Sequence, residues 1–315
     1  MKTLIANIRQ YSGWDSVVAF SKQRDFPGAK GVSVHEVISF FFQEIKRDAI
    51  NIRAGSVAFS FTLSLFPTLL VIFTLIPYIP IRNFQIILLE TINEVMPEEA
   101  FGFLQETIND IITRQNSGLL GAGLLLAIYT SSRGVIGMMN SFDKAYPSFR
   151  KRKAWNKNLV AFKITGLLFL LLLISVALII GGELFIRLIM HWIHSEGAAT
   201  YFWFTLLRFV VIFLVYYVGI SLIYVYGPAT QKRWKFFNAG SILAAVMSVL
   251  VSIIFSWIIN QFGQFNKLYG SIGTVIVLML WIYYNAVTLL IGFELNAAID
   301  VNKHNLLTKS KTAEA

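Results

Sequence analysis

The run AGSVAFSFTLSLFPTLLVIFTLIPYIPI (residues 54–81) contains no charged side chain and lies between Arg53 and Arg82. A helix of about 20 mostly apolar residues is long enough to cross the roughly 30 Å hydrocarbon core of a bilayer. Inside a bilayer every backbone polar group must find a partner within the protein, and a helix satisfies its own. The run therefore predicts a first transmembrane helix.

Five further runs are long and apolar enough to cross a membrane, and the composition of the whole chain agrees with them. The 315 residues are 56% hydrophobic and only 14% charged, whereas soluble domains carry about 25% charged residues. The mean hydropathy is +0.64. We therefore predict an all-α, polytopic membrane protein. Its six transmembrane helices are expected at residues 54–81, 118–142, 164–182, 201–226, 236–266 and 268–293.

The net charge of +10 has two interpretations. It indicates an acidic partner such as nucleic acid, or the excess of Lys and Arg that membrane proteins carry in their cytoplasmic loops. Of the 27 Lys and Arg, 21 lie in residues 1–53, 144–163, 232–235 and 303–311, and they are sparse in the alternate loops. This alternation accounts for the charge without nucleic acid. It predicts that both the N-terminus and the C-terminus lie in the cytoplasm.

Three parts of the chain follow from these boundaries. We predict a cytoplasmic N-terminal segment at residues 1–53, a six-helix transmembrane domain at residues 54–300, and a flexible cytoplasmic tail at residues 301–315. No internal repeat divides the chain further.

Two amphipathic helices are expected outside the transmembrane runs. Ser33 and Glu36 have the spacing of a capping box at the start of SVHEVISFFFQEIKRDAINIRAG (residues 33–55). Apolar residues recur there at helical intervals, which is typical of an interfacial helix leading into the first span. The acidic run PEEAFGFLQETINDIITR (residues 97–114) has the same periodicity and is predicted to cover the outer face.

Motifs that carry catalytic chemistry are scarce. The chain has no cysteine, which excludes disulfides and thiolate metal ligands. His191 and His194 lie beside Trp192 in an outer loop; they form either a weak metal site or two ordinary interfacial residues. The sequence has no HExxH, P-loop, GxSxG or dinucleotide-binding motif. We therefore expect no catalytic residue, no metal and no cofactor, and we interpret the protein as a non-enzyme.

Polar side chains recur about one turn apart within several of the apolar runs. One interpretation is a polar pathway between helices. The other is helix packing, in which small residues let helices approach and hydroxyls bond across the contact. Ionisable and amide side chains at membrane depth favour the pathway. The pathway candidates are Ser60, Ser64, Pro67, Arg133, Asn140, Ser252, Ser256, Asn260, Tyr269, Trp281, Asn285, Thr288, Glu294 and Asn296.

Pro67 lies in the middle of the first run. Proline removes one helical hydrogen bond and kinks a helix. The kink is compatible with a fixed bend and with a hinge.

The run LLLAIYTSSRGVIGMMNSF (residues 124–142) contains Arg133 in its middle. A helix that ended before Arg133 would cover only about 22 Å at 1.5 Å per residue, so the helix is predicted to continue to Phe142. Arg133 then either extends its side chain to the headgroup region or faces the bundle interior. We predict the interior, with Glu294 or Asn296 as its partner and Asn140 nearby, because the sixth run ends on the same side.

Three segments resemble the YihY/BrkB family. They are AGSVAFSFTLSLFPTLLVI (residues 54–72), YGPATQKRWKFFNAGSILAA (residues 226–245) and YGSIGTVIVLMLWIYYNAVTLLIGFELNAA (residues 269–298), and the resemblance covers roughly residues 37–300. It implies a six-span protein of the bacterial inner membrane. Some members of that family have been called virulence factors, and some historically carried the mislabel ribonuclease BN. Transport or export has been proposed for several members.

The residues and the resemblance together favour a transporter, an exporter or a lipid-handling protein. The basic cytoplasmic side suggests an anionic solute or lipid, and the expected partners are membrane lipids, including anionic headgroups. Two alternatives are a non-transporting scaffold in envelope assembly and a membrane-bound hydrolase or ribonuclease.

Overall fold

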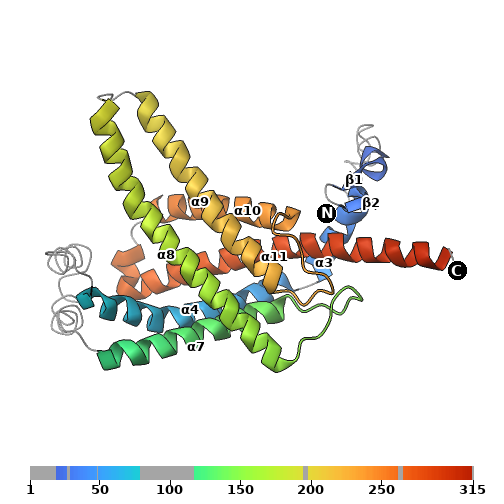
Figure 1. Ribbon diagram of the computed structural model, residues 1–315, viewed down its shortest axis with the longest axis horizontal. Helices are drawn as coiled ribbons and strands as arrows, with labels where there is room; N and C mark the ends of the chain where they lie inside the picture. The colour runs from blue at the N-terminus through green and yellow to red at the C-terminus, as the bar shows by residue number, and fades with distance from the viewer. Residues whose placement is uncertain are drawn as a thin grey trace. The chain divides into compact units, whose positions relative to one another are not determined.

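The computed structural model describes residues 19–26, 29–47, 49–78, 117–193, 198–261 and 265–313 (Figure 1). Among these residues, six helices are long and apolar enough to cross a membrane, which confirms the predicted all-α, six-span architecture. The helices are α3 (Val34–Arg47), α4 (Ile50–Leu75), α7 (Ser117–Ser141), α8 (Ala154–Ile193), α9 (Ala198–Tyr226), α10 (Ala239–Gln261) and α11 (Phe265–Ala313). A short 3-10 helix, η1 (Ile76–Tyr78), follows α4.

Several helices extend beyond the apolar runs that predicted them. Helix α4 begins early enough to include Arg53 in its first turn, and α8 begins well before residue 164. Helix α11 continues to Ala313, through most of the segment at residues 301–315 that the sequence analysis predicts to be a flexible tail. The reason is local: no glycine or proline follows Gly292 to interrupt the helix.

Two helix starts are fixed by side-chain caps. At α3, the Ser33 hydroxyl accepts from the Glu36 amide at 3.2 Å, and the Glu36 carboxylate accepts from the Ser33 amide at 3.2 Å. This is the predicted capping box, which satisfies two amides that the first helical turn leaves without partners. At α10, the Asn238 side chain accepts from the Ser241 amide at 2.8 Å.

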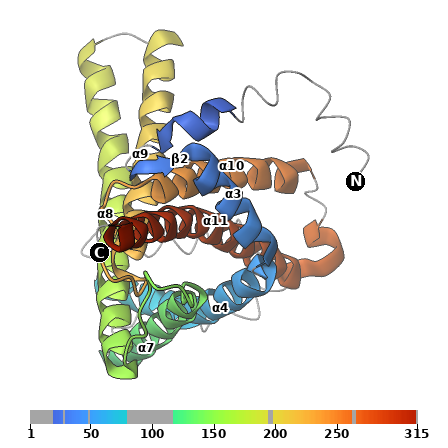
Figure 2. The ribbon, with the colours of Figure 1, turned by 90° about the vertical axis from the view of Figure 1, so that its right-hand side faces the viewer.

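A small antiparallel hairpin precedes α3, and the sequence analysis did not predict it. Strands β1 (Asp25–Phe26) and β2 (Ala29–Ser33) pair with an irregular register. Gly31 in β2 has a φ of 82°, a conformation that residues with a Cβ rarely adopt. The hairpin and α3 lie beside the C-terminal half of α11 (Figure 2), and Val32, Val37 and Ala298 form a small shared core.

The chain divides into two compact units, one comprising residues 1–58 and 136–315 and the other residues 59–135. These boundaries fall inside α4 and α7 and differ from the three parts predicted from the sequence. Within residues 59–135, Gly134 packs against the Ser60 backbone, and Gly123 packs against Leu70 and Val71. Glycine at these positions lets the two helices of this unit approach closely.

In the larger unit, α8 and α9 form an antiparallel pair, and α10 lies along α11 (Figure 1). The α10–α11 contact is tightest at Gly240 and Gly292. A Cβ atom on Gly292 would overlap the Gly240 carbonyl oxygen and the Ala244 side chain, and a Cβ on Gly240 would overlap the Gly292 carbonyl oxygen. The two backbones therefore meet directly, as in small-residue contacts between membrane helices.

We predict that Gly292→Ala destabilises the protein by about 1–3 kcal/mol, because the added methyl group overpacks a backbone contact that cannot move freely. The measurement is the free energy of unfolding of the purified protein in detergent, obtained by denaturant titration.

Gly166→Ala in α8 is the matched control, because a Cβ there meets no heavy atom within 4 Å. We expect it to leave stability unchanged or slightly raised, since alanine has the higher helix propensity. Equal losses in the two variants would show that the α10–α11 contact tolerates a methyl group.

Candidate functional site

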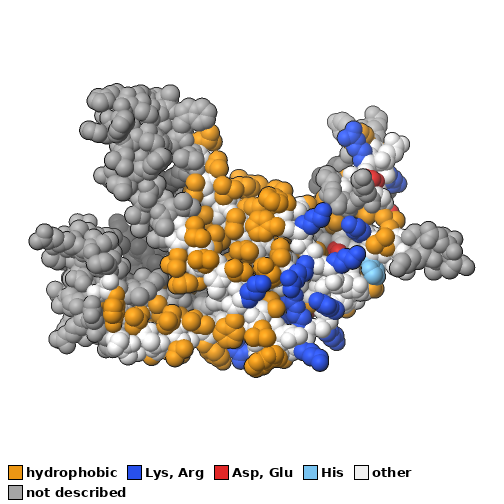
Figure 3. All heavy atoms as spheres, in the orientation of Figure 1, with side chains coloured by type: hydrophobic (Ala, Val, Ile, Leu, Met, Phe, Trp, Pro, Cys, Tyr) orange, Lys and Arg blue, Asp and Glu red, His pale blue; other side chains and the backbone are white. Residues whose placement is uncertain are grey.

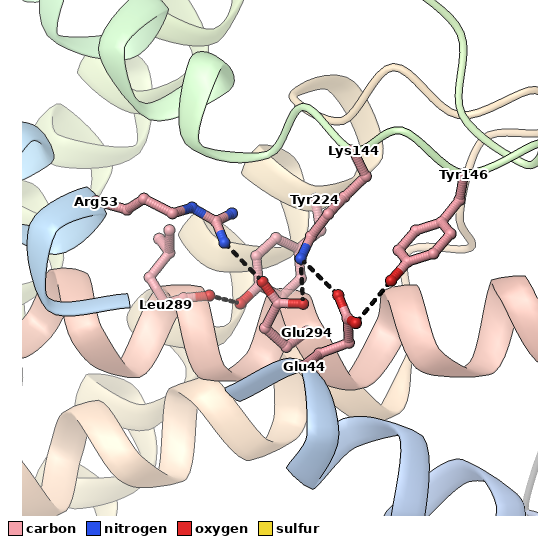
Figure 4. A network of polar contacts seen from close by, with 7 residues as sticks. All are labelled: Glu44, Arg53, Lys144, Tyr146, Tyr224, Leu289 and Glu294. Carbon is pink, nitrogen blue, oxygen red and sulfur yellow. Dashed lines mark hydrogen bonds and ion pairs between the residues drawn. The ribbon is translucent and has the colours of Figure 1, made fainter. Parts of the chain in front are cut away.

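Four charged side chains form a buried chain of alternating sign, which we call the charge ladder: Arg53, Glu294, Lys144 and Glu44 (Figure 4). Arg53 Nη1 lies 2.9 Å from Glu294 Oε1, and Lys144 Nζ lies 2.8 Å from Glu294 Oε2. Lys144 Nζ also lies 3.2 Å from Glu44 Oε2. The Tyr146 hydroxyl donates to Glu44 Oε1 at 2.6 Å, which holds the far end of the ladder.

The ladder joins four separate parts of the larger unit. Glu44 lies in the last turns of α3, Arg53 in the first turn of α4, and Glu294 in the middle of α11. Lys144 and Tyr146 lie in the segment that connects α7 to α8. Helices α4 and α11 both belong to the membrane-spanning set, so the ladder crosslinks two spans to an amphipathic helix and a loop.

Burial makes the ladder an unusual arrangement. The side chain of Glu294 is 0% exposed, those of Lys144 and Glu44 are each 6% exposed, and that of Arg53 is 19% exposed. A buried charge costs several kcal/mol unless it is paired and hydrogen-bonded. Two cations and two carboxylates balance one another here, so each carboxylate has a cation in contact.

Aromatic side chains surround the ladder near Glu294. The rings of Phe142 and Phe293 stack with centroids 4.5 Å apart, and Lys144 Nζ lies 6.0 Å from the Phe293 centroid. Tyr224 packs edge-on against Phe142 and donates its hydroxyl to the Leu289 carbonyl oxygen. An apolar wall of this kind lowers the local dielectric, which strengthens the ion pairs and raises the cost of breaking one.

A second group of polar contacts lies between α9, α10 and α11. Ser252 lies 3.1 Å from the Tyr216 hydroxyl and accepts from Trp281 Nε1 at 3.2 Å. Closer to the ladder, the hydroxyls of Ser248 and Thr288 lie 2.6 Å apart. The polar side chains that recur along the fifth and sixth predicted spans therefore face one another at these positions.

Asn285 and Asn296 use their side chains within the same bundle. Asn285 donates to the Trp281 carbonyl oxygen at 2.9 Å. Asn296 accepts from the Gly240 amide at 2.9 Å and donates to Asn238 at 2.6 Å. Asn296 therefore links α11 to the start of α10 beside the glycine contact.

The predicted pairing of Arg133 with Glu294 or Asn296 joins residues of the two units, and it stays a prediction. Both carboxylate oxygens of Glu294 are taken by Arg53 and Lys144. Arg133 is exposed, and it donates from Nε to the Tyr129 hydroxyl at 3.4 Å, with its guanidinium 5.5 Å from the centre of the Tyr129 ring. A residue one turn away is always within reach on a helix, whereas a partner on another helix depends on how the helices pack.

The remaining candidates separate into three groups. In α4, Ser64 is buried and donates to the Phe61 carbonyl oxygen at 2.7 Å, Ser60 is half-buried, and the helix continues through Pro67. Asn140 and Ser256 are exposed. The side chains of Asn260 and Tyr269 lie outside the described residues.

Two further predictions fall where side chains are not described. The acidic run at residues 97–114 and the pair His191 and His194 cannot be compared with the structure for that reason. Within the described part of the chain, no group of three or more His, Cys, Asp or Glu side chains is placed to hold a metal ion.

The sequence analysis did not identify Glu44, Lys144 or Tyr146 as site residues. It counted Arg53 and Lys144 only among the basic residues that set the topology. One signal for Glu44 was available. Val37 and Glu44 are seven residues apart and so share one face of α3, and both are buried. An acidic residue on the apolar face of an amphipathic helix predicts a buried cation opposite it.

The loops beside the ladder are firmly joined. Phe149 in the α7–α8 loop pairs with Thr230 in the α9–α10 loop. Arg152 donates to the carbonyl oxygens of Tyr226, Gly227 and Pro228, each at 2.9 Å, and so caps the end of α9. Figure 3 shows Lys and Arg side chains gathered around these loops, next to a broad hydrophobic face over α8 and α9.

Six long apolar helices, with charged side chains collected at one end of the larger unit, define a polytopic integral membrane protein. The sequence profile of the family described as Virulence factor BrkB matches residues 41–315, and the chain belongs to that family. It is a multi-pass protein of the bacterial inner membrane.

Several relatives resemble the chain over most of its length. A Bacillus subtilis (strain 168) protein, YfkH, whose name carries the description ribonuclease-like, is 27% identical over 80% of this chain and 90% of its own length. A UPF0761 membrane protein of Tolumonas auensis is 23% identical over 83% of this chain and 84% of its own. Another UPF0761 membrane protein, from Haemophilus influenzae, is 23% identical over 82% and 93%. No solved structure matches the chain.

We predict that Lys144→Gln lowers the free energy of unfolding by about 3–5 kcal/mol, because it leaves Glu44 and Glu294 without their shared cation in a buried site. The double variant Lys144→Gln with Glu44→Gln should recover part of that loss. Denaturant titrations of the four members of this double-mutant cycle in detergent measure the coupling between the two side chains.

Lys157→Gln is the matched control. It breaks an ion pair of 2.7 Å with Asp143, whose side chain is 54% exposed. Exposed pairs contribute at most about 1 kcal/mol, so a small effect is expected. A loss from Lys144→Gln no larger than that of Lys157→Gln would contradict the buried ladder.

Proposed function

We propose that the protein moves an anionic solute or an anionic lipid across the membrane, without an ATPase activity of its own. The observation that carries this proposal is the charge ladder. Its four ionisable groups are buried where α3, α4, α11 and the α7–α8 loop meet. Ionisable side chains inside membrane proteins usually belong to solute pathways or to the groups that control them.

Stability alone is a poor reason for burying these four groups. Buried ion pairs can often be replaced by apolar side chains of similar volume at no cost or with a gain in stability. Positive-inside topology does not require the burial either, because charges that set topology act from loops in water. Lys144 and Arg53 are held against carboxylates, whereas most basic residues of the neighbouring loops are exposed.

The arrangement is suited to exchange with an anion. Lys144 binds two carboxylates at once, and Glu294 binds two cations at once. An incoming phosphate or carboxylate can take the place of Glu294 or Glu44 on Lys144, since Glu294 keeps its contact with Arg53 and Glu44 keeps its hydrogen bond from Tyr146. Such an exchange would release α3 or α11 from the α7–α8 loop, which gives binding a direct effect on helix packing.

The contacts of Ser252, Trp281, Ser248 and Thr288 support a polar route between α10 and α11. They place hydroxyl and indole groups deep within two apolar helices, on the faces that meet. Helix α11 also carries Glu294, which lies toward one end of its contact with α10. Packing accounts for the small residues there, but a Trp Nε1 bonded to a serine adds a polar group that packing does not need.

Hydrolysis, which the name of the Bacillus relative brings to mind, is the weaker proposal for this chain. A general base needs a carboxylate that is free to accept a proton from substrate. Both carboxylates of the ladder are held by Lys144 and Arg53 within ion-pair distance. We therefore propose that the ladder binds and gates rather than catalyses.

The test is transport by the purified protein in liposomes of phosphatidylethanolamine and phosphatidylglycerol. Two probes are used: fluorescent phosphatidylglycerol, followed by dithionite quenching, and a set of radiolabelled organic and inorganic anions. We predict a flux of at least one probe that falls about tenfold or more in Glu294→Gln. That variant leaves the cations of the ladder without their shared carboxylate.

Asp143→Asn is the control. Asp143 is exposed, and its ion pair is with Lys157, which is not part of the ladder. Its flux should equal that of the unmodified protein. Folded protein that carries none of the probes would overturn the proposal. Copurification of a stoichiometric envelope protein in that case would favour the scaffold role.

A further inference from the structure

A second cationic site lies at the end of α9 and consists of residues that do not belong to the ladder. Lys163 of α8 and Arg233 of the α9–α10 loop both face the ring of Tyr226. Lys163 Nζ lies 4.1 Å from the ring centroid and Arg233 Cζ lies 5.6 Å from it. Cations over an aromatic face are held there by the ring quadrupole. One tyrosine therefore brings two cations from different segments together.

Positive charge is in excess at this point. Burial lowers the pKa of the neighbouring Arg152, and the charges of Arg150 and Arg233 lower it further, while Asp143 opposes them. Asp143 is itself bound to Lys157 at 2.7 Å. In the described part of the chain, no carboxylate lies within ion-pair distance of Lys163 or Arg233.

Lys163 and Arg233 differ in role from Arg152. The guanidinium of Arg152 is occupied by the three carbonyl oxygens at the end of α9. Lys163 and Arg233 are exposed, and each has polar hydrogens available to a ligand. An arginine can bind two oxygens of a phosphate in a planar fork, and a lysine adds a compact charge beside it.

The depth of the site suits a lipid headgroup. Tyr226 ends the apolar span Phe209–Tyr226, and Lys163 directly precedes a charge-free run of α8. Tyr, Lys and Arg are enriched at this boundary between hydrocarbon and water.

An apolar face of α8 continues from Lys163 into the membrane. Phe162, Phe169, Leu170 and Leu173 are between 47% and 53% exposed. Their spacing places them on one side of the helix. Figure 3 shows hydrophobic side chains over α8 and α9 next to a cluster of Lys and Arg side chains. A phospholipid whose phosphate binds Lys163 and Arg233 would therefore have its acyl chains along this face.

We propose that Lys163 and Arg233, organised by the Tyr226 ring, bind the phosphate of an anionic phospholipid such as phosphatidylglycerol, with its acyl chains along the exposed face of α8. The site is separate from the charge ladder, and lipid binding there does not require transport. A failure of the transport experiment would leave this proposal intact.

The test is native mass spectrometry of the purified protein titrated with phosphatidylglycerol or phosphatidylcholine. We expect preferential binding of phosphatidylglycerol and a loss of about 30-fold in affinity in Lys163→Gln with Arg233→Gln, the effect of removing two cations near a membrane surface. Arg233→Gln alone should lose about fivefold by the same reasoning. Arg233 is an exposed loop residue, so this variant retains its fold.

Lys151→Gln with Lys232→Gln is the matched control. It makes the same change in net charge at exposed residues of the α7–α8 and α9–α10 loops, outside the Tyr226 cluster, and should change affinity less than threefold. Equal losses in the two double variants, or equal binding of phosphatidylcholine, would overturn the proposal. A third arm adds glycerophosphoglycerol or inorganic phosphate at millimolar concentration. Displacement of the lipid by either would assign the site to a free phosphate instead.

Discussion

The burial of Glu294 is the constraint around which the larger unit is arranged. A fully buried carboxylate in the middle of an apolar helix is tolerated only with a cation in contact. Arg53 and Lys144 supply that contact from two other elements, and Glu44 then balances Lys144. The position of α3, the first turn of α4 and the α7–α8 loop beside α11 all follow from this pairing.

Close backbone packing supports the same region from the other side. Gly240 and Gly292 let α10 and α11 touch, and Asn296 bonds to the Gly240 amide within the same contact. Polar contacts contribute about 0.6–2 kcal/mol each between membrane helices, where close packing of small residues also drives association. Helix α11 thus carries its glycine contact, its ion pairs and its link to α3 within a few turns.

The basic side chains of the protein serve more than one purpose. Those of the exposed loops agree with the positive-inside pattern, and two of them gather on Tyr226 at the membrane boundary. Lys144 and Arg53 belong to the same count of charges but are buried against carboxylates. Location in the fold, rather than residue type, separates the exposed charges of the loops from the charges that are buried in ion pairs.

The sequence by itself determined the six helices, the capping box at Ser33 and Glu36, and membership in a family of membrane proteins. These features depend on local spacing, composition and length, which can be read from the sequence without knowing how the helices pack. Only the tertiary structure decided the partner of Glu294. Arg53 lies 241 residues from Glu294 along the chain. Periodicity within a helix shows which face a side chain occupies, but it does not show which residue of another helix meets that face. The sequence analysis therefore paired Glu294 with Arg133, whereas the structure pairs it with Arg53 and Lys144.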